Sequence, residues 1–334
     1  MTPIIASERL DAFPGERLPF QLPDFVRVSW VSDRAREKWA PRLVALIRMW
    51  QDVERRSVLE GVRRCAIVRN PRKGTAPEEG SMSSGLRVLV ERDLPSKPAP
   101  KTPFGNGAHD ASGLSAYLVV SNSLADAEAM QEAWDLEDHD RIGELLGYPS
   151  CCRVAFIARC SAGHLIDHTW AMGAETTGSV LPSLLVQQHG VRWTNVLWRP
   201  VGVRTVPHLP CRFDCHASQQ FGVSLLAIAR GEQYESERGW LHQILSWPVE
   251  WSSLHGIAEI KTPIMKIATT SDAVSIKISL SWEGEMYPEE GAQGVTFPYR
   301  TPERAIVSDS TTFLRGLAEA GLVQIRGIQE RSSC

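Results

Sequence analysis

The sequence predicts an α+β fold, and three patterns support that class. Apolar residues recur at three- and four-residue spacing over 32–60, which is typical of an amphipathic helix. The residues of 257–278 alternate in short runs, which is typical of an antiparallel meander. Helices and strands also follow one another without regular βαβ alternation. We therefore expect a helical cysteine-bearing region packed against an antiparallel β meander.

The first part of the chain predicts one long helix, three strands and two shorter helices. Residues 1–30 are punctuated by prolines and are expected to form an extended arm. Ser32 and Asp33 are candidate caps for the long helix. The strands are expected over 65–68, 86–90 and 116–121, and the shorter helices over 123–134 and 138–146.

The second part predicts further helices followed by the meander. Ser150 is a candidate N-cap for a helix that carries Cys151 and Cys152 in its first turn. The later elements are expected to be helices over 180–189, from Asp214 or just after it to 229, over 240–247 and over 311–320, with strands over 257–261, 264–267 and 273–278. Two domains are predicted, an N-terminal α/β subdomain over 1–135 and a cysteine-cluster region with a C-terminal antiparallel sheet over 136–334. One continuous domain is the alternative.

Composition indicates a globular protein with no general attraction to polyanions. The chain has 334 residues, of which 43% are hydrophobic and 22% charged, and a formal net charge of -3. We expect neither a nucleic-acid nor a membrane partner from this balance. The first residues lack a basic segment followed by an apolar run, so a cytoplasmic location is expected. In a reducing compartment, clustered cysteines indicate metal ligands or redox groups.

Five of the seven cysteines fall between residues 145 and 218, and four of them form two tight clusters. Cys151 and Cys152 form the first cluster, and Cys211 and Cys215 form the second. Four thiolates fill the coordination sites of a tetrahedral zinc ion or of an iron–sulfur cluster. The sequence therefore predicts that these four residues are metal ligands.

The adjacent pair favours an iron–sulfur cluster, a 4Fe-4S centre in particular, with zinc as the alternative. Neighbouring side chains on a helix point about 100° apart, which is awkward for one small ion. The free N–H groups at a helix N-terminus also lower the pKa of a thiol. We expect Cys152 to face inward with Phe156 and Cys151 to be the labile or substrate-facing thiol.

Other residues are weaker candidates for the same site. Cys160 and His164 are four residues apart and could chelate one ion from a helix, with His168 one turn further. His208 and His216 flank the second cluster, where they could bind the cofactor or donate a hydrogen bond to a sulfur. The C-terminal Cys334 is a candidate carrier of reducing equivalents.

A second possible site lies near the end of the chain. Glu289 and Glu290 stand in a glycine-rich loop over 284–298, where a carboxylate could serve acid–base chemistry. Lys261 could face the same small molecule. Glu290 and Lys261 are therefore the candidate catalytic residues beside Cys151.

The segments Leu146-Gly147-Tyr148-Pro149-Ser150-Cys151-Cys152 and Pro210-Cys211-Arg212-Phe213-Asp214-Cys215 carry a family resemblance. They resemble a prokaryotic family, a domain of unknown function, with Leu-Gly-Tyr-Pro-x-Cys-Cys and Pro-Cys-x3-Cys signatures. The resemblance covers roughly residues 140–225. It implies that the four cysteines belong to one site, and it implies no activity.

Two functions from different classes follow. In the first, the chain is an iron–sulfur enzyme that carries out redox or sulfur-transfer chemistry on a small molecule, in a biosynthetic pathway and with an electron donor as partner. In the second, zinc stabilises a binding module that catalyses nothing. The sequence has no Gly-x-x-x-x-Gly-Lys-Ser/Thr, no His-Glu-x-x-His and no Cys-x3-Cys-x2-Cys, which disfavours nucleotide-driven and typical radical chemistry.

Overall fold

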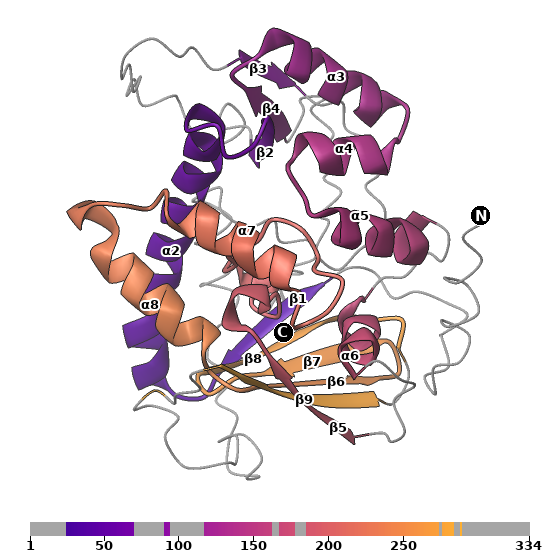
Figure 1. The fold of residues 1–334 in the computed structure, drawn as a ribbon. Helices are drawn as coiled ribbons and strands as arrows, with labels where there is room; N and C mark the ends of the chain where they lie inside the picture. Colours follow the sequence, from indigo (N-terminus) through magenta and orange to yellow (C-terminus); the bar gives the residue numbers. More distant parts are fainter. Residues whose placement is uncertain are drawn as a thin grey trace, which may run out of the picture.

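A computed structural model describes residues 25–69, 90–93, 117–161, 167–177, 185–273, 276–283 and 288. These residues form two β-sheets and several helices, so the predicted α+β class is confirmed (Figure 1). The larger sheet has six strands in the order β1-β8-β7-β6-β9-β5. Its strands are β1 (Val26–Trp30), β5 (Leu185–Gly190), β6 (Val249–Leu254), β7 (Ile257–Lys261), β8 (Met265–Thr270) and β9 (Ile276–Trp282).

The meander is present and the three predicted strands correspond to β7, β8 and β9, but their pairing differs from the prediction. Strands β6, β7 and β8 run antiparallel in succession, and β9 returns to pair with β6, placing Trp251 opposite Ile278. The prediction placed β9 next after β8 and missed β6. Strand β6 is hard to recognise because the polar Ser253 occupies a buried position on the same face as Val249 and Trp251, so the alternation of apolar and polar residues ends after Ser252.

The predicted helix over 180–189 is wrong for its second half. Residues Leu185–Gly190 form strand β5, which pairs parallel to β9 at the edge of the sheet. Val186 and Gln188 are buried, whereas Gln187 and His189 are exposed, which is a period of two. The buried Gln188 amide donates to the Gly173 carbonyl, so a polar residue occupies an inward position and hides the strand pattern from sequence reasoning.

Most helices follow the predicted segments, except that Thr169–Thr177 was not predicted to be helical and the predicted helix over 240–247 begins at Glu235. The predicted helix over 311–320 lies outside the described residues. The helices are α2 (Asp33–Leu59), α3 (Leu124–Asp135), α4 (His139–Leu145), α5 (Ser150–Phe156), α6 (Thr169–Thr177), α7 (His216–Leu226) and α8 (Glu235–Leu245). Helix α2 begins where predicted, because the Ser32 side chain accepts from the Ala35 N–H at 3.1 Å. Within the described residues, no helix is long and apolar enough to cross a membrane.

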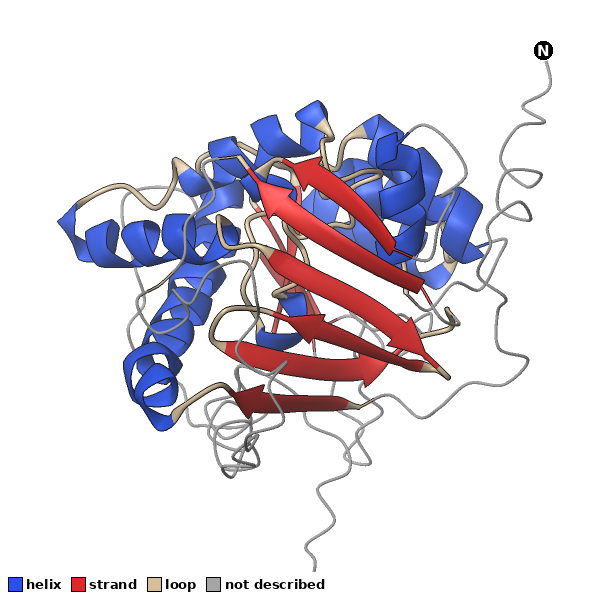
Figure 2. Cartoon of the chain, turned by 90° about the horizontal axis from the view of Figure 1, so that it is seen from below, coloured by secondary structure: helices blue, strands red, loops and turns tan. Residues whose placement is uncertain are grey.

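The main core lies between the large sheet and the helices on one of its faces (Figures 1 and 2). Trp39 of α2, Trp198 and Trp247 are fully buried there. The ring centroids of Trp39 and Trp247 are 4.7 Å apart, and those of Trp198 and Trp247 are 5.8 Å apart, both edge-on. The tryptophan-rich composition therefore serves packing at these positions.

The smaller sheet has the order β2-β4-β3 and lies beside α2 and α3, and Leu145 of α4 packs with its residues Cys65 and Val119. Its strands are β2 (Cys65–Arg69), β3 (Val90–Asp93) and β4 (Tyr117–Ser121). The predicted strand over 86–90 meets β3 at Val90, and the rest of that prediction lies outside the described residues. The division at residue 135 stays a prediction, although β1, from the first part, pairs with β8, from the second.

Candidate metal centre

The first cysteine pair is presented by the N-terminus of α5. Gly147 adopts a left-handed φ of 73° and ends the preceding turn. Pro149, rather than the predicted Ser150, is the N-cap, and its carbonyl accepts from the N–H groups of Cys152 and Arg153 at 3.0 Å. Both cysteines thus lie in the first helical turn, as predicted, where the helix dipole favours negative charge.

The second pair lies in the loop that leads into α7. Cys215 is the N-cap of this helix, which therefore starts just after Asp214 as expected, and the Cys215 sulfur accepts from the Ser218 N–H at 3.5 Å. The loop is anchored by Arg159, whose guanidinium donates to the Cys211 carbonyl at 3.0 Å. Sequence reasoning missed Arg159, which no local pattern marks.

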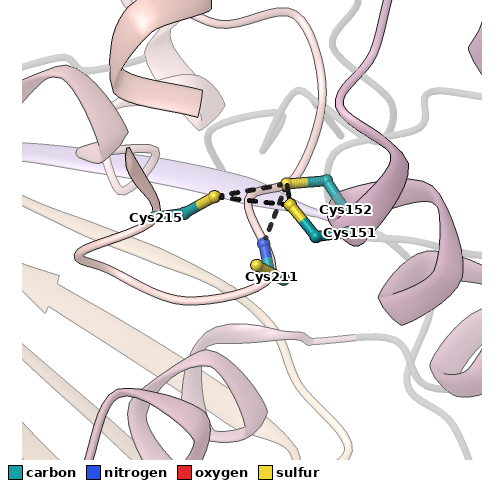
Figure 3. A group of neighbouring side chains, drawn as sticks. All are labelled: Cys151, Cys152, Cys211 and Cys215. Carbon is teal, nitrogen blue, oxygen red and sulfur yellow. Dashed lines mark hydrogen bonds between the residues drawn. The ribbon is translucent and has the colours of Figure 1, made fainter. Parts of the chain in front are cut away.

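The four predicted cysteines converge on one point (Figure 3). The Sγ atom of Cys151 lies 3.8 Å from those of Cys152 and Cys215, and the Cys152 and Cys215 sulfurs are 3.7 Å apart. All four sulfurs, Cys211 included, lie within 4.8 Å of one another. Four thiols that close can bind a metal ion, so the predicted grouping of these residues is confirmed.

The cluster lies at the protein surface and is unequally accessible. Cys152 and Cys215 are buried, Cys211 is half-buried and Cys151 is exposed. The site is therefore closed by protein on the side of Cys152 and open to solvent on the side of Cys151.

Hydrogen bonds to the sulfurs are also unequal. Cys152 Sγ accepts from the Cys211 N–H at 3.3 Å and lies 3.1 Å from the Ser218 hydroxyl. That hydroxyl lies 2.8 Å from Nε2 of His208, so Ser218 links His208 to the Cys152 sulfur. Sequence reasoning missed Ser218, whose signal is its position three residues after the capping Cys215.

His208 is a neutral imidazole in this arrangement. Its side chain is 5% exposed, and burial, with the nearby Arg199 adding to it, lowers the pKa of His208 to about 3. When its Nε2 donates to Ser218, Ser218 can donate onward to the Cys152 thiolate. His208 is thus placed as a partner of a ligand, and the group of four converging ligand atoms does not include it.

Proximity also couples the ionisation of the metal-free thiols. Hydrogen bonds from Cys152 and Cys211, together with the Ser218 N–H, lower the pKa of Cys215. The same contacts with Cys152 and Cys215 raise the pKa of Cys211. One thiolate therefore forms easily at the helix cap, and further ionisation calls for a cation among the sulfurs.

The remaining candidate residues do not join this group in the described part of the chain. His216 is exposed at the first position of α7. Cys160 lies in a π-helical turn over Ile157–Ser161, and its side chain, like His164 and Cys334, lies outside the described residues. His168 is buried, and its ring stacks 6.4 Å from that of Phe156.

Lys261 belongs to the large sheet. Its ammonium lies 3.4 Å from the buried carboxylate of Glu250 and 3.8 Å from that of Glu259. Burial lowers the pKa of Lys261. Glu290 lies outside the described residues, so a site shared by Lys261 and Glu290 stays a prediction.

No family model, curated protein or solved structure matches the chain. The resemblance to a domain of unknown function therefore stays a prediction. What the fold and the site define is an α+β protein with a surface cluster of four cysteines that can bind a metal ion.

Proposed function

We propose that Cys151, Cys152, Cys211 and Cys215 hold one tetrahedral metal ion, zinc by preference, which joins α5 to the loop before α7. The supporting observation is the spacing of the sulfurs. A tetrahedral ion with metal–sulfur bonds of about 2.3 Å has sulfur–sulfur edges of about 3.8 Å. Three of the sulfur–sulfur distances are 3.7 to 3.8 Å.

These sulfur–sulfur distances favour one ion over the 4Fe-4S cluster that the sequence suggested. In a cubane, each thiolate binds a different iron, so the four sulfurs must spread further apart than around one ion. The adjacency of Cys151 and Cys152 favoured the larger cluster in the sequence analysis. It does not prevent both residues from binding one ion, since their sulfurs lie only 3.8 Å apart.

The proposed ion has a structural role on its buried side and an accessible ligand on the other. Cys152 and Cys215 are enclosed, and their sulfurs accept hydrogen bonds from protein groups. The exposed Cys151 is the ligand that a small molecule can reach. Of the four sulfurs, the one that is least shielded by hydrogen-bond donors and by protein is the most nucleophilic.

Metal analysis of protein purified under anaerobic conditions tests this proposal. We expect one zinc per chain and a colourless protein, and we expect Cys211→Ala to lose the metal. Cys65→Ala is the matched control, because Cys65 is a fully buried cysteine of β2 outside the four-sulfur group. Full zinc occupancy in Cys211→Ala would contradict the proposal.

The second candidate function is an iron-dependent enzyme that carries out redox or sulfur-transfer chemistry with an electron donor and a small molecule. The observation that favours it is the exposure of Cys151, which leaves the centre open to both partners. Tetrahedral sulfur coordination suits iron as well as zinc. Visible absorption from thiolate-to-iron charge transfer, with iron in the metal analysis, would select this candidate.

A further inference from the structure

The sulfur of Cys151 is the part of the candidate metal centre that a molecule in solution can reach. Cys151 is exposed at the start of α5, whereas the side chains of Cys152 and Cys215 are 2% and 5% exposed. Cys152 is also shielded by the Cys211 N–H and the Ser218 hydroxyl, which lie 3.3 and 3.1 Å from its sulfur. Because the oxidation of a cysteine follows its accessibility, an oxidant that approaches this centre meets Cys151 first.

Two neighbouring sulfurs lie near enough to react with an oxidised Cys151. The sulfurs of Cys152 and Cys215 are each 3.8 Å from that of Cys151, and Figure 3 draws both contacts. A disulfide bond is about 2.05 Å long, so each pair has to close a gap of less than about 2 Å. Movements of the side chains can close such a gap, and the backbone then decides which pair can bond.

Backbone geometry selects Cys215 over Cys152 as the partner. The Cα atoms of neighbouring residues are about 3.8 Å apart, whereas a disulfide usually joins Cα atoms about 4.4 to 6.8 Å apart. Cys151 and Cys152 also share the first turn of α5, where the Cys152 N–H donates to the Pro149 carbonyl at 3.0 Å. A bond between these neighbours would disrupt that turn. Cys215 belongs to a separate segment, 64 positions further along the chain, so the restriction on neighbours does not apply to it.

We propose that Cys151 and Cys215 form a reversible disulfide when a peroxide reaches the centre, and that this bond releases the metal ion. The inference rests on the proposed function, since it takes zinc as the bound ion. The disulfide removes two of the four thiolates, and a structural zinc site needs four ligands. The two thiolates that remain, those of Cys152 and Cys211, bind zinc too weakly to retain it, so the centre acts as a redox-sensitive zinc switch.

The reaction balances with hydrogen peroxide as the oxidant. The Cys151 thiolate attacks one oxygen of the peroxide, the O–O bond breaks, and a sulfenic acid and a hydroxide form. The Cys215 thiolate then attacks the Cys151 sulfur, the S–O bond breaks, and the disulfide and a second hydroxide form. Two electrons pass from the two sulfurs to the peroxide, and the hydroxides take protons from solvent to become water. A dithiol reductant reverses the bond by thiol–disulfide exchange.

The disulfide would keep two helix starts together after the ion has left. Cys151 belongs to the first turn of α5 and Cys215 caps α7, so the new bond joins the same two elements as the ion. A covalent bond that closes a long segment stabilises a fold by restricting the unfolded chain. We therefore expect oxidation to empty the site while α5 and α7 stay joined.

Peroxide titration of the anaerobically purified full chain tests this inference, after its zinc content has been measured. We expect one zinc ion to be lost for each disulfide formed, with a chromogenic chelator reporting the free zinc. Peptide mapping under non-reducing conditions identifies the linked residues. A Cys151–Cys215 link that dithiothreitol reverses supports the proposal. Any other pairing as the main product would overturn it, as would release of zinc without a disulfide.

Cys215→Ser and Cys211→Ser form a matched pair of variants, because each removes one thiolate from the group of four. Without Cys215, the sulfenic acid on Cys151 has no partner, so dimedone should trap it as an adduct. In Cys211→Ser the disulfide should still form, and dimedone should leave Cys151 unlabelled. Equal labelling of Cys151 in the two variants would contradict the role of Cys215. Peptide mapping of the wild type decides the pairing if either variant does not fold.

The same measurements separate this inference from the proposed function. A chain purified without metal that still forms the Cys151–Cys215 link would contradict the zinc site, and with it the release of an ion, while supporting the disulfide. Bound zinc that peroxide does not release, in a chain that forms no link, would support the zinc site and overturn the switch.

Discussion

Cys151 and Cys152 are neighbours in the chain with opposite surroundings. The Cys152 side chain is 2% exposed and its sulfur contacts the Cys211 N–H and the Ser218 hydroxyl, whereas Cys151 is exposed. The sequence predicted this difference from the alignment of Cys152 with the Phe156 side of the helix. Burial sets the roles that we expect, with Cys152 anchoring the site and Cys151 facing the solvent.

Cys152→Ala should therefore lose the metal and lower the Tm by roughly 5–10 °C, because coordination contributes directly to folding free energy. Cys151→Ala should reduce metal affinity or activity, and it should lower the Tm less than Cys152→Ala does. Metal content and thermal melting of the two variants, measured side by side, check this order. Equal losses of Tm would show that the exposed ligand is as structural as the buried one.

Alkylation gives an independent measurement of the same asymmetry. We expect iodoacetamide to modify Cys151 first in the metal-loaded protein, since its sulfur is accessible and Cys152 and Cys215 are enclosed. Mass spectrometry of peptides over time gives the order. If Cys152 reacts first, the assignment of the two thiols is reversed.

The buried His168 predicts how the stability of the protein depends on pH. Burial first, with Arg159 and Arg199 adding to it, lowers the pKa of His168 to about 3, whereas an unfolded histidine titrates near pH ~6.5. Between these values the unfolded chain binds the extra proton. The contribution of the neutral His168 to the free energy of unfolding is therefore fully present above pH ~6.5. It is lost as pH falls towards 3, by up to about 1.4 kcal/mol per pH unit.

His168→Gln should flatten this acid-side loss when urea unfolding is compared at about pH 5 and pH 7. Asp167, whose pKa burial raises to about 6, acts in the opposite direction but is present in both proteins. His189→Gln is the control, because His189 is exposed on β5. An identical pH dependence in wild type and His168→Gln would contradict the prediction.

At the scale of elements, the candidate metal centre joins two helix N-termini. Helix α5 supplies Cys151 and Cys152 from its first turn, and α7 is capped by Cys215. A short helix such as α5 (Ser150–Phe156) is marginal on its own. An ion bound by the four cysteines would therefore stabilise α5 by joining it to the longer helix α7 (His216–Leu226).

Removal of the metal with a chelator should loosen these two helix starts before it affects the sheet. We expect hydrogen exchange to rise over Ser150–Phe156 and in the first turn of α7, and to stay slow over β6 and β7, which are paired on both sides. Exchange mass spectrometry before and after chelation measures this. Uniform loss of protection across the chain would show that the ion supports the whole fold rather than one junction.

The elements that sequence could predict are those whose own residues determine them. Helix α2 has both a serine cap and a sustained apolar stripe, and its bounds were predicted closely. Strand β5 has neither: its inward Gln188 is a polar residue that donates to the Gly173 carbonyl, and its pairing partner β9 lies far along the chain. Such a strand depends on tertiary contacts that no local pattern reports.

At the scale of the whole molecule, helices α2, α6, α7 and α8 and the large sheet share one tryptophan-lined core. Trp39→Ala should destabilise the protein by about 3–5 kcal/mol, because it leaves a cavity at the contact with Trp247. Leu136→Ala, at a residue 72% exposed, should change stability by less than about 0.5 kcal/mol. Urea unfolding of both variants tests the contrast, and similar losses in the two would place the core elsewhere.

The site was predicted as a set of ligands but not as a geometry. Clustering in sequence identified all four cysteines, since residue type and spacing are local properties. The separation of their sulfurs, the Ser218 link to His208 and the Arg159 anchor depend on how distant segments meet. The sequence favoured the larger cluster because it does not report the separation of the sulfurs, on which our proposal of one ion rests.

The positions of the four cysteines also set an order of events during synthesis. Cys151 and Cys215 bracket β5, whereas the strand that pairs with β5 begins only at Ile276. A ribosome therefore releases every thiol of the cluster before it releases β9. An ion captured by the nascent chain would close the loop around β5 and shorten the search of this edge strand for its late partner.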